Sequence, residues 1–125
     1  MPTPLRSAVL IVGAFFALQG VNWLANPAGA AEALGMPLLD GAGRSTQIGD
    51  FAAFFLAIGG TTLFGARAGH ARLLLVPAGL LAAAALARTL AFAVHGAAFA
   101  AIPIAVEVSC GALLAFASRG PRAKA

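Results

Sequence analysis

Charged side chains are scarce in this chain. Only 10% of its 125 residues are Asp, Glu, Lys or Arg, whereas 61% are hydrophobic. A soluble domain usually has about a quarter of its residues charged. The shortage of charge therefore argues against a soluble globular domain and favours a protein whose solvent is the lipid bilayer. The net charge of +4 comes mostly from residues that flank apolar runs, so it predicts membrane topology signals and no nucleic-acid partner.

The chain also lacks the residue patterns that catalysis and cofactor binding usually need. Cys110 is the single cysteine, so no internal disulfide is possible, and we expect this thiol to be a small core residue. No Cys pair, His-rich metal cluster, Gly-rich phosphate loop or nucleophile–base spacing occurs. The sequence therefore predicts no cofactor and no metal, and it makes an enzyme the least favoured class of function.

Long apolar runs fill most of the chain, at residues 8–25, 48–66, 73–94 and 98–117. Each has about the length, near 20 residues, that crosses a hydrocarbon core of roughly 30 Å. The linkers after the second and third runs are short, which makes the helices they join antiparallel neighbours. We predict an all-α fold, a single domain that forms an integral membrane bundle of four transmembrane helices in up-down order. The predicted helices lie near residues 6–25, 47–67, 73–95 and 98–118.

The first apolar run has a second interpretation. Arg6, the apolar core and the small residues Ala28-Gly29-Ala30 resemble a cleavable signal peptide. The run is long for a signal core, and it carries Gln19, Asn22 and Trp23. We therefore predict a retained helix.

The linker between the first two helices, residues 26–47, is the longest. Pro27 suits the first turn of a helix, so residues 28–34 are predicted to form a short helix that ends at Gly35. Its apolar residues place this helix on the membrane surface. A plain connector is the alternative.

Basic residues are concentrated on one side of the predicted bundle. Arg44 is alone on the other side, beside Glu32, Asp40 and Asp50. Because basic flanks stay in the cytoplasm, we predict a multi-pass protein of a bacterial inner membrane with both termini cytoplasmic. The basic side carries Arg6, Arg67, Arg72, Arg119, Arg122 and Lys124.

Two charged residues interrupt the apolar runs, Arg88 in the third and Glu107 in the fourth. A charge inside a bilayer costs at least about 2–3 kcal/mol, so it normally faces the bundle interior and has a partner. At about 1.5 Å per residue, Arg88 lies roughly 22 Å along its helix and Glu107 roughly 13 Å below the outer edge, so both fall in the outer half. We predict that the two side chains pair, approaching within about 4 Å.

Four further polar residues are predicted in the same outer half. Gln19 and Asn22 share a face of the first helix, Asp50 opens the second, and His95 lies seven residues after Arg88 on one face of the third. With the Arg–Glu pair, they predict a polar pocket that is open to the outside of the membrane.

Simpler interpretations exist for each of these residues. The Arg88–Glu107 pair is also expected if it only joins two helices, because membrane bundles use polar pairs in this way. Asp50 suits a helix cap, His95 suits a helix end, and Trp23 suits the aromatic belt at the membrane surface.

Small residues repeat at the spacing that lets helices pack closely in lipid. We expect Gly13, Ala17 and the block 82–85 to face other helices, and Ala53 with Ala57 carries the same packing signal.

The stretch 49–60, the segment 86–96 with Arg88 and Gly96, and Pro103 followed by Glu107 resemble a set of small bacterial four-helix membrane proteins of unknown function. These proteins are distantly similar to the DoxX type. The shared pattern is an Arg late in the third helix, a Gly shortly after it and a Glu in the fourth helix. Relatives tend to carry Asp-Gly where this chain has His95-Gly96. The resemblance implies the four-helix fold and no established activity.

The predicted pocket favours a non-catalytic protein that binds a lipid-like or small polar molecule, a membrane-protein partner or a second copy of itself. A small proton-coupled transporter using Glu107 is the alternative. Small multidrug exporters also have four helices, but they place their Glu in the first helix, and the charge bias of this chain disfavours their dual topology. A structural bundle, with Arg88–Glu107 as helix–helix contact only, is the third possibility.

Overall fold

The computed structural model describes residues 1–120, and every regular element within them is helical. This confirms the all-α prediction for the described part of the chain. The basic residues Arg122 and Lys124 lie outside the described residues. The helices are α1 (Thr3–Ala25), α2 (Pro27–Ala33), α3 (Gly41–Gly65), the 3₁₀ turn η1 (Ala71–Leu74), α4 (Leu75–His95) and α5 (Ala101–Ala117).

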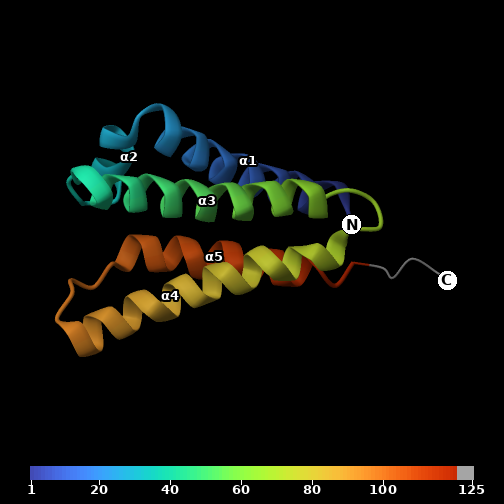
Figure 1. The fold of residues 1–125 in the computed structure, drawn as a ribbon. Coiled ribbons are helices and arrows are strands. Elements are labelled where there is room, and N and C mark those ends of the chain that lie inside the picture. The colour runs from blue at the N-terminus through green and yellow to red at the C-terminus, as the bar shows by residue number, and fades with distance from the viewer. Residues whose placement is uncertain (121–125) are drawn as a thin grey trace.

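The helices are arranged in two layers (Figure 1). Helices α1 and α3 pack side by side in one layer, with α2 at the end where they are joined, and α4 and α5 form the second layer. Consecutive long helices run in opposite directions, so the N-terminus and the end of α5 lie at the same end of the molecule. The short turn η1 carries the chain from α3 in one layer to α4 in the other.

Three helical segments are long and apolar enough to cross a membrane, namely Thr3–Ala25, Gly41–Gly65 and Ala71–His95. The fourth, α5, has 17 residues and is about 25 Å long at 1.5 Å per residue. It begins at Ala101, later than the predicted residue 98, because Gly96 ends α4 in the left-handed conformation with φ 66°. Residues 97–100 then form an irregular connection.

Helix α3 begins at Gly41, ahead of the predicted start near residue 47. The added residues are small or polar and lie outside the apolar run, which shows that the helix continues where the hydropathy signal stops. The short helix predicted after Pro27 is confirmed as α2, with Pro27 at its first position. The Asn26 side chain accepts a hydrogen bond from the Gly29 N–H at 3.3 Å and caps this helix.

Small residues hold α1 and α3 close together. A Cβ added to Gly59 would collide with the Ala17 backbone, and one added to Gly13 would lie 2.9 Å from the Leu63 side chain. The prediction that Gly13 faces another helix is therefore right, and Ala17 meets α3. The packing prediction is wrong for four exposed alanines, namely Ala53, Ala57, Ala82 and Ala83. Consecutive residues of a helix point in different directions, so a block of small residues cannot all face one neighbour.

Aromatic side chains form a continuous stack along the interface of α1 and α3. Trp23 stacks on Phe51 with ring centroids 4.7 Å apart, Phe51 on Phe55 at 6.4 Å, and Phe55 on Phe16 at 6.0 Å. Trp23 is only 1% exposed. The expectation that Trp23 belongs to an interfacial belt is therefore wrong, since the close approach of the two helices encloses its ring.

Large apolar side chains cover the exterior of the helices. Ile102 is 80% exposed, Ile11 70% and Val94 68%. A water-soluble monomer seldom exposes extended apolar patches. This surface therefore suits lipid and agrees with the spanning lengths of the helices.

Candidate functional site

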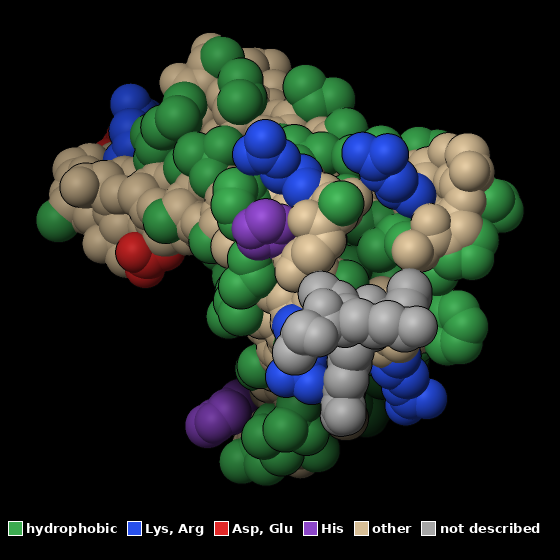
Figure 2. Space-filling view, turned by 90° about the vertical axis from the view of Figure 1, so that its right-hand side faces the viewer, with side chains coloured by type: hydrophobic (Ala, Val, Ile, Leu, Met, Phe, Trp, Pro, Cys, Tyr) green, Lys and Arg blue, Asp and Glu red, His purple; other side chains and the backbone are tan. Residues whose placement is uncertain are grey.

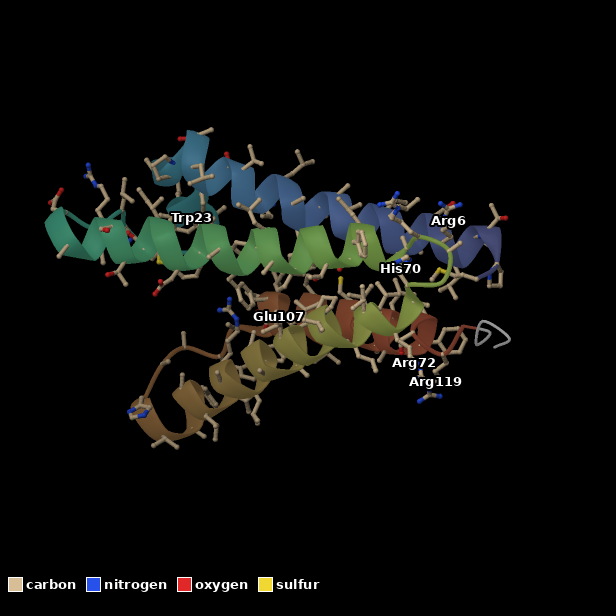
Figure 3. The ribbon with its side chains drawn as sticks, turned by 45° about the vertical axis from the view of Figure 1, so that its right-hand side comes forward. Arg6, Trp23, His70, Arg72, Glu107 and Arg119 are labelled. Atoms are coloured by element: carbon tan, nitrogen blue, oxygen red, sulfur yellow. The ribbon has the colours of Figure 1, made fainter. Side chains whose placement is uncertain are left out.

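Arg88 on α4 and Glu107 on α5 form an ion pair. The Arg88 Nε donates a hydrogen bond to the Glu107 Oε1 at 2.8 Å. The predicted contact is confirmed, and its origin is the matching depth of the two residues on antiparallel helices. Figure 3 shows Glu107 between the two helix layers.

The two partners differ in burial. The Glu107 side chain is 9% exposed, whereas that of Arg88 is 34% exposed. The second carboxylate oxygen of Glu107, Oε2, is fully buried and has no hydrogen-bond partner within residues 1–120. Leaving a buried polar atom unpaired usually costs about 1–3 kcal/mol, and more for a charged group. The pair therefore satisfies only half of the carboxylate, and the site retains an unused acceptor.

Arg88 also retains hydrogen-bonding capacity. Its contact with Glu107 uses Nε, and within the described residues its terminal guanidinium nitrogens make no hydrogen bond. A guanidinium has five N–H donors. Unused donors and an unused acceptor thus belong to the same ion pair.

This pair borders a pocket of about 480 Å³ between the two helix layers. Small-molecule sites typically have volumes of about 300–1,000 Å³ and combine apolar walls with a few polar groups. The wall here is aromatic, and all four long helices contribute. The lining consists of Phe16, Asp50, Phe51, Phe54, Phe55, Leu81, Ala84, Arg88 and Glu107.

Of the six predicted site residues, the structure brings three to this pocket, namely Asp50, Arg88 and Glu107. Asp50 is exposed and supplies a second acidic group to the lining. Its carboxylate makes no ion pair within residues 1–120.

Gln19, Asn22 and His95 do not line the pocket. On α1, Phe16 and Trp23 are buried, and Gln19 and Asn22 are only half-buried, because the helix is rotated to bury its aromatic residues. His95 is exposed in the last turn of α4. It shares a helical face with Arg88, but the seven residues between them correspond to about 10 Å along the helix axis, so it lies outside the pocket.

The sequence interpretation missed the aromatic wall. Phe51, Phe54 and Phe55 follow the i, i+3, i+4 spacing of one helical face, and this spacing was the available signal.

Gln47 was also missed. It is buried, its Oε1 accepts from the Leu39 N–H at 2.9 Å, and its Nε2 donates to the Pro37 carbonyl at 3.0 Å, so it fastens the linker before α3.

Within residues 1–120, no group of three or more His, Cys, Asp and Glu side chains is placed to hold a metal ion. The chemistry that this arrangement supports is recognition. Phenylalanine rings can hold an apolar body, and the Arg88–Glu107 pair can hold a polar head that both donates and accepts hydrogen bonds.

Comparisons of the chain with protein-family models, with curated proteins and with solved structures found no significant match. Its function is therefore argued from the geometry of the site.

Proposed function

We propose that this chain is an integral membrane protein of four up-down helices that binds a lipid-like molecule with a hydroxylated head in the pocket beside Arg88 and Glu107. The membrane assignment is supported by three helices of spanning length and by their apolar exteriors. The shorter α5 is accommodated by local thinning of the bilayer or by the irregular residues that precede it. With the basic end in the cytoplasm, as expected in a bacterial inner membrane, the pocket lies in the outer half.

One observation carries the ligand assignment. Glu107 Oε2 is buried, without a hydrogen-bond partner among residues 1–120, beside a pocket walled by phenylalanines. A hydroxyl donates one hydrogen bond and accepts others, so it can pair with Glu107 Oε2 and with a free Arg88 nitrogen together. The aliphatic part of such a molecule then packs on the aromatic wall. The ligand enters from lipid or from the outer surface, and Asp50 at the pocket favours neutral or cationic heads over anionic ones.

Photocrosslinking of the full chain in detergent micelles tests this proposal. A diazirine-bearing hexadecanol is the probe, and the matching alkane without the hydroxyl is the control ligand. We expect the alcohol to label residues of the pocket at least about fivefold more than the alkane, since a satisfied buried hydrogen bond is worth about 1 kcal/mol or more.

The paired variant Arg88→Met with Glu107→Leu removes both charges and keeps the apolar volume. It should abolish the preference for the alcohol while the pocket still takes both probes weakly. Equal labelling by alcohol and alkane in the unaltered protein contradicts the proposal. An unchanged preference in the paired variant leaves Arg88–Glu107 as a helix–helix contact only.

Proton-coupled transport through Glu107 is the alternative. It requires the same carboxylate, but it also predicts substrate flux in proteoliposomes that depends on a proton gradient. Flux that is lost with Glu107→Gln favours transport over simple binding.

A further inference from the structure

A second pocket lies at the opposite end of the molecule from α2, where both described ends of the chain meet. It has a volume of about 640 Å³. Three arginines line it: Arg6 from α1, Arg67 from the segment between α3 and η1, and Arg72 from η1. Ser118 and Gly120, which follow α5, complete the lining. Figure 3 labels Arg6, Arg72 and the neighbouring Arg119 at this end.

Among residues 1–120, the charged side chains that line this pocket are all basic. The acidic residues of the sequence are Glu32, Asp40, Asp50 and Glu107, and none of them lines it. The two salt bridges within residues 1–120 involve Arg44 and Arg88, at other places in the fold. The three arginines of the pocket therefore have no carboxylate partner among the described residues.

Local contacts hold two of these arginines in place. The Arg6 Nε donates to the Ala66 carbonyl at 3.2 Å. The Arg67 guanidinium lies over the Phe64 ring, 5.4 Å from its centroid, which is a cation–π contact. Because these contacts use few of the N–H groups, most donors remain for an anion.

Exposed apolar residues lie within three positions of the lining residues along the chain. Phe64 is 43% exposed, Leu73 40% and Phe116 62%. Figure 2 shows the arginine side chains of this end face, among residues 1–120, with hydrophobic side chains beside them. A ligand that fits here has an anionic head and an apolar body that continues along the helices.

We propose that this pocket binds the phosphate of an anionic phospholipid, with the acyl chains on the exposed apolar residues beside it. Guanidinium groups bind phosphate oxygens through charge-assisted and often paired hydrogen bonds, and basic pockets beside membrane helices suit anionic headgroups. The proposal goes beyond the function of the Arg88–Glu107 pocket and shares with it only the embedding in a bilayer.

Native mass spectrometry of the full chain in detergent tests the proposal, with phosphatidylglycerol and phosphatidylcholine of identical acyl chains as probes. We expect phosphatidylglycerol to bind at least about tenfold more tightly, since each basic residue near an anionic surface contributes a several-fold preference. The variant Arg67→Gln with Arg72→Gln should bring the two lipids to within about twofold of each other.

Matched variants separate a pocket from general positive charge. Arg119→Gln removes a charge at the same end from an exposed residue outside the lining, and Arg44→Gln removes one at the other end; both should keep the preference. The Arg88→Met, Glu107→Leu variant should also keep it, which separates this site from the proposed function. Thermal unfolding of each variant confirms that the fold is retained.

Three results would overturn the proposal. The first is equal binding of the two lipids to the unaltered protein. The second is a loss of the phosphatidylglycerol preference with Arg119→Gln that is as large as with the double arginine variant. The third is displacement of phosphatidylglycerol by excess inorganic phosphate at constant ionic strength. The last result would assign the pocket to free phosphate. Failure of inorganic phosphate to displace the lipid supports the phospholipid as ligand.

Discussion

Glu107 and Arg88 join the two helices of the second layer and also line the pocket between the layers. Removing one partner of a buried ion pair leaves a charge without compensation, which typically costs 3–5 kcal/mol. Arg88 is about a third exposed, so solvent reduces that cost. We therefore expect Glu107→Leu to lower the free energy of unfolding by about 1–3 kcal/mol.

Adding Arg88→Met to Glu107→Leu should recover most of that loss, because no uncompensated charge then remains. Unfolding by SDS in mixed micelles measures both variants. Asp40→Asn is the control, since the exposed Asp40–Arg44 pair contributes little. A double variant less stable than Glu107→Leu alone would contradict this account.

Gln47 shows what residue identity alone does not reveal. In the sequence it is one polar residue at the edge of an apolar run. In the fold it is 5% exposed and bonds backbone groups of Pro37 and Leu39. No local pattern predicts this role, because its partners lie 8 and 10 residues earlier and are brought to it by the path of the linker.

At the scale of the elements, neighbouring glycines of α3 make a sharp comparison. A Cβ on Gly59 meets the Ala17 backbone of α1, whereas a Cβ on Gly60 meets nothing within 4 Å. We expect Gly59→Ala to force α1 and α3 apart and to cost about 1–3 kcal/mol, the usual price of overpacking. Gly60→Ala should be neutral or stabilising, since alanine favours helix over glycine.

Thermal unfolding in detergent, with circular dichroism, measures both glycine variants. The two substitutions add the same methyl group to adjacent residues, so helix propensity is matched between them. Equal stability of the two variants would mean that the close contact of α1 and α3 contributes little.

The rotation of each helix about its axis was harder to predict than its length. The lengths of α1 and α4 follow from hydropathy, and both helices have bounds near the predicted ones. In a membrane, however, apolar residues suit both lipid and the interior. The apolar pattern therefore does not distinguish Ala52, which is buried, from Ala53, which is exposed.

For the whole molecule, the arrangement of charge predicts orientation. One end of the molecule holds the described N-terminus, the α3–η1 connection and the end of α5. The basic residues at this end are Arg6, Arg67, Arg72 and Arg119. With Cys110→Ala as background, we expect cysteines at Thr3 and Ala68 to be labelled by an impermeant maleimide only after the cell is opened. A cysteine at Ala42 should be labelled in intact cells.

This expectation follows from the retention of basic flanks in the cytoplasm. Labelling of all three cysteines in intact cells, or of Thr3 and Ala42 from the same side, contradicts the orientation. Cells that carry the Cys110→Ala protein alone control for background labelling.

The sequence by itself determined the helical class, the approximate bounds of the long helices and the contact between Arg88 and Glu107. The class and the bounds follow from composition along the chain. The contact follows from the depth of each residue in its helix, which is its position in the helix times about 1.5 Å per residue. A charge in an apolar run also has few possible partners, which made the pair predictable.

Only the tertiary structure decided which residues share the pocket. Asp50 joined Arg88 and Glu107, whereas Gln19, Asn22 and His95 did not. The aromatic stack enclosed Trp23, and phenylalanines formed the wall. The physical reason is that helix rotation is set by close packing between helices, here by Gly59 against Ala17, and this packing depends on residues far apart in the chain.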